Sequence, residues 1–478
     1  MWFHSTRGGA VPVGAAAAIR AGMAADGGLF VPETLPALAP EALAPDLPFP
    51  DRAASVLRPF FAGDPAAPDL DALCRAAFTF PVPLRWRGEE GQAMLELFHG
   101  PTLAFKDIGA RFLAEFLDAA ERAAGPGTLA PGDPGRPEAA RTFAGSGVAG
   151  PDDRGAPCHG PGSPAAAGPA SPLPLHVLVA TSGDTGGAVA AAFAGRATAR
   201  VSVLFPAAGV SERQRAQLTC WGGNVTAYAV AGTFDDCQRL VKAAFAVPGQ
   251  AQRLRLTSAN SINLGRLLPQ VTYYVEAAAR FAARLGEPPL VVVPTGNVGN
   301  VTAAFWAKAM GAPLGEIVLA VNANRVLPDF LATGEFRPRP SLATLANAMD
   351  VGNPSNWERV RTLFGGDDKI CQQVQAYSVT DDEIRQTIRE VFAATGEILC
   401  PHTAVAERVR RTRFPGRPAI VVATAHPAKF ETIVEPLIGR ALPVPPALAD
   451  LLARPRREHP LDPSSPPPWE ELAGPAGR

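Results

Sequence analysis

Lysine is scarce in this sequence, although basic residues are not. Of the 44 basic residues in the 478-residue chain, only five are lysines: Lys106, Lys242, Lys308, Lys369 and Lys429. Arginine supplies the positive charge everywhere else, so each remaining lysine is a candidate for chemistry that arginine cannot do. That chemistry is to lose a proton and attack a carbonyl carbon.

Long hydrophobic runs and clusters of basic residues are also missing. No stretch of about 18 uncharged apolar residues suggests a membrane-spanning helix, and the N-terminus lacks the pattern of a signal peptide. With a formal net charge of −1 and no basic run, the sequence predicts binding to neither nucleic acid nor an anionic membrane. We expect a protein that acts on a small molecule, as a monomer or as a dimer.

Cysteines are few and scattered. The six cysteines form no Cys-x-x-Cys pair and have no histidines clustered beside them, which argues against a zinc site. The sequence therefore predicts free thiols, no bound metal and a cytoplasmic location, where the environment is reducing.

The order of apolar and turn-forming segments indicates an α/β fold. The β-branched runs "LPLHVLVA", "VSVLFP", "PPLVVVP", "IVLAVN" and "RPAIVVATA" read as buried strands that alternate with helices. This alternation predicts two α/β domains with mostly parallel sheets flanked by helices. Ligands of such sheets bind at the carboxyl ends of the strands.

Composition also suggests domain boundaries. Residues 1–90 are Pro-punctuated and predict a small helical N-terminal region, and residues 91–225 predict a smaller α/β domain. Residues 226–440 predict a larger α/β domain, followed by a Pro-rich tail at 441–478. Residues 125–174 are dense in Gly, Pro, Ala and Ser, so we expect a mobile insertion or linker there.

The segment "VVVPTGNVGNVTAA" (291–304) is a candidate anion site. Gly296 and Gly299 let backbone N–H groups point toward a ligand, and a helix that begins near Val301 adds its positive dipole end. The segment is neither a Walker loop nor a G-x-G-x-x-G fingerprint. The alternative interpretation is an ordinary tight turn between a strand and a helix.

A second such loop is "ATSGDTGGAVAAAF" (180–193). Ser182 and Thr185 supply hydroxyl groups, Gly183 and its neighbours supply accessible N–H groups, and no positive charge is present. Such a loop suits a carboxylate. The alternative is a helix N-cap made by Ser182, Asp184 or Thr185.

The segment "HGPTLAFKDIGARF" (99–112) places Lys106 where an amphipathic helix begins. Burial and the helix terminus would both lower the pKa of its ammonium group and free the amine for Schiff-base formation. The alternative is a solvated helix residue. Lys429, in "TAHPAKF", is the rival nucleophile, whereas the three other lysines lie in patterns typical of solvated positions.

Two further segments, 256–274 and 347–359, are rich in Asn and Ser next to an arginine. Candidate groups for a phosphorylated or carboxylated substrate are Asn263, Arg266, Asn353, Asn356 and Arg359. Turns and caps are the alternative for each of them. A lysine, two anion loops and several strand ends together suggest an enzyme that uses pyridoxal phosphate.

Seven motifs in order carry a closer resemblance. They are "STRGG" with "DGGLFVPE", "FHGPTLAFKD", "TSGDTGGA", "SANSINLGR", "PTGNVGN", "AMDVGNPSNWER" and "TAHPAKF". From residue 4 to about residue 435, apart from the 125–174 segment, the chain resembles the threonine synthases of bacteria and fungi. The resemblance implies a fold-type-II pyridoxal phosphate enzyme that converts O-phospho-L-homoserine and water to L-threonine and phosphate.

The resemblance also implies roles for residues. Lys106 matches the lysine that bonds to the cofactor, and Thr424 matches the hydroxyl that meets the pyridine nitrogen. The loop around the cofactor phosphate corresponds to Gly296, Asn297, Val298, Gly299 and Asn300, where family members commonly have Phe in place of Val298. Candidate substrate-binding residues are Thr102, Ser182, Gly183, Asp184, Thr185, Asn263, Arg266 and Arg359.

The motifs do not exclude two other functions. A phospho-lyase on the same scaffold would release 2-oxobutyrate and ammonia from the same substrate and would need the same lysine. A non-catalytic ligand-binding homologue is the other alternative, but it would have no need of Lys106.

Overall fold

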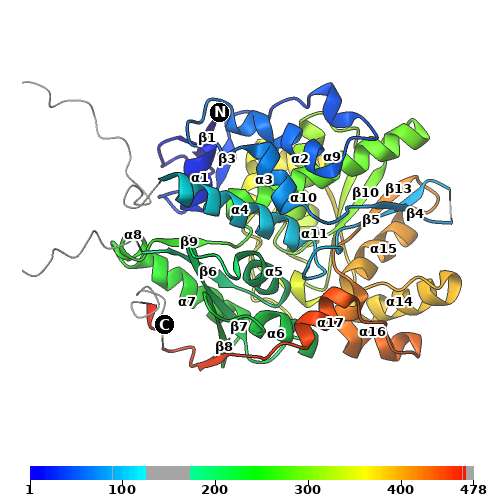
Figure 1. Ribbon diagram of the computed structural model, residues 1–478. Helices are drawn as coiled ribbons and strands as arrows, with labels where there is room; N and C mark the ends of the chain where they lie inside the picture. Colours follow the sequence, from blue (N-terminus) through cyan, green and yellow to red (C-terminus); the bar gives the residue numbers. More distant parts are fainter. Residues whose placement is uncertain (89, 125–172, 466, 470–478) are drawn as a thin grey trace, which may run out of the picture.

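The computed structural model describes residues 1–88, 90–124, 173–465 and 467–469. Two sheets flanked by helices make up most of the molecule, and a small antiparallel sheet lies near the N-terminus (Figure 1). The predicted α/β class is confirmed. The insertion predicted at 125–174 lies outside the described residues, except for residues 173 and 174.

The larger sheet has six strands. In spatial order these are β12 (Gln375–Ser378), β11 (Ile317–Val321), β10 (Leu290–Pro294), β13 (Ala419–Ala423), β5 (Gln92–Glu96) and β4 (Leu84–Trp86). All neighbours are parallel except β4 and β5. Strands β10, β11 and β13 are buried along their whole length, as expected for parallel strands covered on both faces.

The second sheet has five parallel strands. In spatial order these are β14 (His459–Leu461), β8 (Val225–Val230), β7 (Ala199–Pro206), β6 (Leu175–Ala180) and β9 (Leu256–Ser258). The side chain of Asn260, just after β9, donates to the carbonyl of Ala180 at the end of β6 over 2.8 Å. The loops that follow these two strands therefore lie side by side.

Four helices pack together beside the sheets and carry site residues at their N-termini. They are α4 (Lys106–Ala124), α5 (Asp184–Phe193), α9 (Leu264–Leu285) and α10 (Gly299–Ala309). Their apolar side chains, among them Phe112, Phe193 and Val301, belong to one core that also includes residues of both sheets.

The remaining helices pack against the sheets or against other helices. The α-helices are α1 (Ala15–Ala21), α2 (Phe49–Leu57), α3 (Leu70–Ala77), α6 (Glu212–Thr219), α7 (Phe234–Ala246), α8 (Gln250–Arg253), α11 (Val326–Thr333), α12 (Trp357–Phe364), α13 (Asp367–Gln373), α14 (Asp381–Thr395), α15 (Pro401–Arg413), α16 (Glu431–Ile438) and α17 (Pro446–Leu452). Short 3-10 turns are η1 (Pro40–Leu43), η2 (Arg58–Phe61), η3 (Asn347–Met349) and η4 (Pro427–Phe430).

The N-terminal region was predicted to be helical, but it also contains strands. It holds α1 to α3 but also the antiparallel strands β1 (Trp2–Ser5), β2 (Val13–Gly14) and β3 (Phe30–Pro32). Asp26 joins the motifs "STRGG" and "DGGLFVPE". Its carboxylate accepts from Ser5 Oγ at 2.7 Å and from the N–H of Gly28 at 2.9 Å. The short strands were missed because Gly and Pro interrupt any alternating pattern.

The predicted domain boundaries differ from the observed sheets. The boundary at residue 225 falls between β7 and β8, which pair directly. Strand β5, predicted to lie in the smaller domain, pairs with β13 of the larger sheet. The predicted tail at 441–478 contains α17 and β14. Strands that are far apart in the chain pair in the same sheet. Such pairing leaves no local pattern in the sequence, so the composition could not predict which sheet a strand joins.

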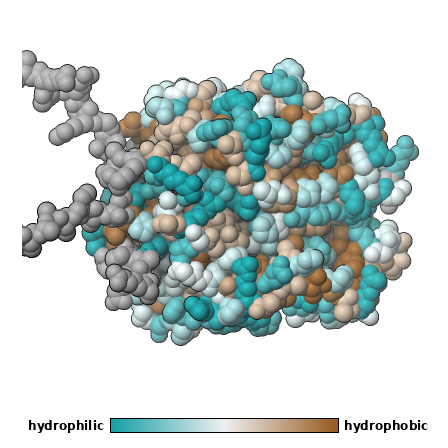
Figure 2. Space-filling model, in the orientation of Figure 1, coloured by the Kyte–Doolittle hydropathy of each residue, from teal (hydrophilic) through white to brown (hydrophobic). Residues whose placement is uncertain are grey.

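In the described part of the chain, no helix is long and apolar enough to cross a membrane. The cysteines of this part are free, as predicted, and no cluster of metal-ligating side chains occurs in it. Hydrophilic residues cover much of the visible face, with hydrophobic patches between them (Figure 2).

Candidate active site

Three neighbouring strands of the larger sheet end side by side at the candidate site. Val292 of β10 pairs with Val421 of β13, and Ala423 at the end of β13 pairs with Glu96 at the end of β5. The loops that follow lead to residues 295–300, to Thr424 and to Lys106. Parallel register thus brings the predicted cofactor residues to one edge of the sheet.

Direct backbone contacts join the Lys106 loop to the Thr424 loop. The N–H of Phe105 donates to the carbonyl of Thr424 over 2.8 Å, and the N–H of His426 donates to the carbonyl of Leu103 over 3.1 Å. Leu103 has a left-handed φ of 58°, which turns the chain sharply before the helix. Lys106 is therefore held beside Thr424 by main-chain geometry.

Lys106 is the first residue of α4, as the sequence predicts. Burial lowers the pKa of its ammonium group to about 8, the nearby charges of Arg266 and Lys429 act in the same direction, and Asp184 opposes them. A lysine with this pKa loses its proton near neutral pH far more readily than an exposed lysine. The amine is suited to covalent bonding with an aldehyde.

Lys429, the rival nucleophile, is fully buried and held in place. Its Nζ atom lies 2.7 Å from Oδ1 of Asp184 and donates to the carbonyl of Thr102 over 2.8 Å. Burial acts to raise the pKa of Asp184, but nearby positive charge, above all that of Lys429, outweighs burial and holds that pKa well below its usual range. Lys429 and Asp184 therefore form a buried ion pair, which ties up this amine.

The loop at 182–185 presents hydrogen-bond donors without acceptors. Thr181 Oγ1 accepts from the N–H groups of Gly183 and Gly186, each at 2.9 Å. In the part of the chain that the structure describes, neither the N–H groups of Ser182, Asp184 and Thr185 nor the hydroxyls of Ser182 and Thr185 have a hydrogen-bond partner. These groups at the start of α5 can bind a carboxylate; the side chain of Asp184 instead binds Lys429.

The loop at 295–300 has the same property at the start of α10. No acceptor among the described residues meets the N–H groups of residues 296–299. Only glycine fits at position 296 without a clash, because a Cβ atom there would lie 2.6 Å from Cα of Met349. Val298 has a left-handed φ of 65°, and its side chain is buried in the core. A left-handed residue of this kind is typical of loops whose successive N–H groups bind an anion.

The asparagines of this loop use their side chains to hold it. Asn297 donates to Ser261 Oγ over 2.6 Å and accepts from the N–H of Ser355 at 2.7 Å. Asn300 accepts from Thr295 Oγ1 at 2.7 Å and donates to the carbonyl of Pro294 over 2.9 Å. Backbone N–H groups, rather than these amides, are left for an anion.

These features fit pyridoxal phosphate. Unpaired N–H groups at the start of α10 suit its phosphate, and the Lys106 amine suits its aldehyde. The hydroxyl of Thr424, which has no hydrogen-bond partner among the described residues, suits its ring nitrogen. All three lie at the ends of the neighbouring strands β10, β5 and β13.

Several predicted substrate residues make bonds within the protein. Thr102 donates through its N–H and hydroxyl to Asp107, over 2.9 and 2.7 Å. Asn263 caps α9 and donates to the carbonyls of Ile19 and Ser258, over 3.0 and 2.9 Å. Their contact with substrate stays a prediction.

The two predicted arginines are buried. Arg359 donates to the carbonyls of Phe30 and Ile262, over 3.0 and 2.7 Å, and burial lowers its pKa to about 9. Arg266 donates to the carbonyl of Ala259, while its buried Nε has no hydrogen-bond partner among the described residues. Arg359 braces the N-terminal region; Arg266 keeps donor capacity near Lys106.

Sequence reasoning missed three polar side chains of the site. Gln214 donates to Asp184 over 3.0 Å, Gln217 donates to the carbonyl of Thr102 over 3.1 Å, and His402 is close enough to Lys106 and Asp184 for their charges to affect its pKa. The glutamines lie in a polar helix with no distinguishing spacing. His402 follows Cys-Pro at a helix start, and a lone histidine there gives no clear signal.

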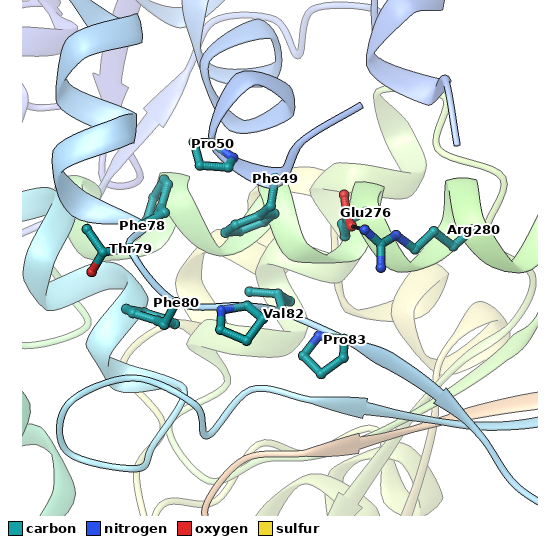
Figure 3. A pocket seen from close by; sticks show the side chains of 10 residues that line it. Phe49, Pro50, Phe78, Thr79, Phe80, Val82, Pro83, Glu276 and Arg280 are labelled. Atoms are coloured by element: carbon teal, nitrogen blue, oxygen red, sulfur yellow. Dashed lines mark ion pairs between the residues drawn. The ribbon is translucent and has the colours of Figure 1, made fainter. Parts of the chain in front are cut away.

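A surface hollow of about 410 Å³ lies elsewhere, between α2, the 78–83 segment and α9 (Figure 3). Phe49, Phe78 and Phe80 line it beside the ion pair of Glu276 and Arg280, whose charged atoms are 2.6 Å apart. None of the predicted site residues borders this hollow.

Comparisons with known proteins agree with this geometry. Residues 172–424 match the family "Pyridoxal-phosphate dependent enzyme", residues 2–78 match "Threonine synthase N terminus" and residues 403–466 match "Threonine synthase, C-terminal". The chain is 37% identical to threonine synthase of Haemophilus influenzae, over 90% of both chains. It is also 37% identical to threonine synthase of Escherichia coli, over 93% of both.

Solved structures give the same result. The crystal structure of threonine synthase from Escherichia coli superposes with a TM-score of 0.80 at 35% identity, covering 99% of this chain and 98% of that one. A pyridoxal-phosphate-bound threonine synthase from Brucella melitensis superposes with a TM-score of 0.82 at 31% identity, covering 100% of both. The chain belongs to the threonine synthase family of pyridoxal-phosphate-dependent enzymes.

Proposed function

We propose that this chain converts O-phospho-L-homoserine and water to L-threonine and phosphate, with pyridoxal phosphate bound at Lys106. One observation carries the proposal: an amine with a lowered pKa lies at the same sheet edge as a loop of unpaired N–H groups. Family membership supplies the reaction. We also propose a cytoplasmic location, which the free thiols of the described cysteines support.

The residues that would hold the cofactor are those whose N–H or hydroxyl groups have no partner among the described residues. The N–H groups of residues 296–299 would bind its phosphate, and the hydroxyl of Thr424 would meet its ring nitrogen. When bound, pyridoxal phosphate stabilises the negative charge that develops on the substrate carbons. A neutral hydroxyl at the ring nitrogen, rather than a carboxylate, leaves that nitrogen less protonated and moderates this effect.

Lys106 Nζ would carry protons during the reaction. In its unbonded state the amine can take a proton from the substrate and return it, because a pKa of about 8 is close to neutral pH. Burial is the main cause of this low pKa, and the charges of Arg266 and Lys429 reinforce it. The charge of Asp184 raises the pKa of Lys106, but that charge is largely neutralised by Lys429 at 2.7 Å.

The substrate carboxylate would bind at residues 182–185. A carboxylate there would accept from the N–H groups at the start of α5 and from the hydroxyls of Ser182 and Thr185. The Asp184 carboxylate would repel it if it were free, so the ion pair with Lys429 also protects this binding mode. Gln214, which donates to Asp184 over 3.0 Å, adds to that restraint.

The test is product analysis with purified holoenzyme and O-phospho-L-homoserine. The proposal predicts equal amounts of threonine and phosphate, with little 2-oxobutyrate. Release of 2-oxobutyrate and ammonia in place of threonine would identify a phospho-lyase. A protein that binds the cofactor and releases no phosphate would be a non-catalytic homologue.

A further inference from the structure

His402 is a buried histidine whose protonation form is fixed by the backbone. Its side chain is 3% exposed, near the start of α15. Nε2 accepts a hydrogen bond from the N–H of Ala348 at 3.1 Å. Burial lowers the pKa of the ring to about 4, and the charges of Lys106 and Lys429 add to this while Asp184 opposes it. The ring is therefore neutral at physiological pH, with its proton on Nδ1.

The Nδ1–H group has no acceptor among the described residues. Buried donors in folded proteins are nearly always paired, so an unpaired one needs an explanation. A second buried atom lies in the turn that His402 contacts: Oδ1 of Asn347 also has no hydrogen-bond partner in the described part of the chain. The Asn347 oxygen is an acceptor and would take a donor, whereas Nδ1–H of His402 would take an acceptor, so it is the histidine donor that can bind an anion.

That turn, η3, lies between the two loops with free N–H groups. Asn347 donates to Gln214 Oε1 over 3.2 Å, and Gln214 donates to Asp184 at the start of α5. Met349, at the other end of the turn, lies against Gly296 of the loop before α10. His402 thus contacts the segment that connects the proposed carboxylate loop with the proposed cofactor phosphate loop.

The surroundings favour an anion. Lys106, Lys429 and Asp184 are the charged groups that act on His402, and Asp184 is already paired with Lys429. Because Lys429 compensates Asp184, no unpaired negative charge among these groups opposes an anion, and a neutral N–H donor suits an oxyanion, which is a strong hydrogen-bond acceptor. The cofactor phosphate already has the N–H groups of residues 296–299, so a substrate oxyanion is the better match.

We propose that Nδ1–H of His402 donates a hydrogen bond to an oxyanion of the bound substrate, either its carboxylate or its phosphate group. The inference rests on the proposed function for the identity of the substrate. It makes His402 a residue that binds and orients substrate relative to Lys106.

Two substitutions separate this role from a structural one. His402→Asn keeps a donor near the position of Nδ1 but loses the acceptor for Ala348. His402→Gln keeps an acceptor near the position of Nε2 but loses the donor at Nδ1. His459→Gln, at an exposed histidine of β14, is the matched control. Each variant is prepared as holoenzyme, and its melting temperature is measured.

The readout is equilibrium binding of inorganic phosphate and, separately, of L-threonine, which has the carboxylate without the phosphate. Loss of a hydrogen bond to a charged group weakens binding by about 10- to 100-fold. We expect this loss in His402→Gln for one of the two ligands, which identifies the oxyanion, and a smaller loss in His402→Asn. The affinity of the apoenzyme for pyridoxal phosphate should be unchanged in both.

Other outcomes overturn the inference. If His402→Gln binds both ligands as the wild type does, or if wild-type holoenzyme binds neither, His402 does not bind a substrate oxyanion. A fall in cofactor affinity without a fall in ligand affinity would assign the donor to the cofactor instead. If His402→Asn is the weaker binder, the contact with Ala348 is what matters. Product analysis of the wild type tests the proposed function separately.

Discussion

The Nζ atom of Lys429 lies 2.7 Å from Oδ1 of Asp184, and both side chains are buried. Two residues that the sequence offers as a nucleophile and a substrate ligand thus neutralise each other. Their pairing leaves Lys106 as the amine available for the cofactor. It also places a compensated charge pair next to an amine that has to lose its proton.

Removing one partner of this pair should destabilise the fold. Lys429→Met leaves the Asp184 carboxylate buried without its cation, and we expect the free energy of unfolding to fall by about 3–5 kcal/mol. Urea denaturation of the apoenzyme measures this fall. Lys308→Met is the control, because Lys308 is exposed and only donates to the carbonyl of Gly315. Equal stability of both variants would contradict the buried-pair interpretation.

Combining Lys429→Met with Asp184→Asn should restore part of the lost stability, because no uncompensated charge then remains buried. The amide introduced by the second substitution can still contact Gln214. A double variant as unstable as Lys429→Met alone would mean that packing, rather than charge, accounts for the loss.

The sequence predicts most elements of the site because each lies in a short motif at a strand end. Strand runs such as "LVVVP" and the glycines after them mark β10 and its loop, and Lys106 begins α4 as expected. The ion pair of Lys429 and Asp184 could not be predicted, since it joins residues far apart in the chain. Sheet membership was missed for the same reason: β5 pairs with β13, and no local pattern encodes that contact.

Lys106→Ala should abolish turnover. The variant lacks the amine that we propose bonds to the cofactor and acts as base at the substrate carbon, so we expect at least about a 1,000-fold loss in kcat. The visible absorbance of the bound cofactor should change as well. Lys308→Ala should keep the activity and spectrum of the wild type. A fully active Lys106→Ala variant would contradict the assignment of this lysine.

Stability should fall in mild acid through a histidine outside the site. Burial lowers the pKa of His176 from 6.5 to about 4, and Arg200 acts in the same direction. Between these two pH values the unfolded chain binds a proton that the folded chain does not, so stability is lost as pH falls from about 6.5 to about 4. This histidine alone should cost about 2 kcal/mol at pH 5 relative to pH 7.

The variant His176→Gln tests this contribution. Gln does not titrate and can still bond to Ser202, which the histidine ring contacts at 2.9 Å. Denaturation of wild type and variant at pH 5 and pH 7 should show a smaller difference between the two pH values in the variant. Identical differences would mean that His176 does not contribute.

Gly296→Ala should weaken cofactor binding more than it weakens the fold. A Cβ atom at this position would lie 2.6 Å from Cα and 2.8 Å from the carbonyl oxygen of Met349, so the loop before α10 or the η3 turn has to move. Overpacking of this kind costs about 1–3 kcal/mol, and because the strain falls on the proposed phosphate loop, we expect affinity for pyridoxal phosphate to fall by about tenfold or more. Gly88→Ala is the matched control, since its Cβ would meet no described atom within 4 Å. Titration of both apoenzymes with pyridoxal phosphate, followed by absorbance, measures the difference, and wild-type affinity in Gly296→Ala would place the cofactor phosphate away from this loop.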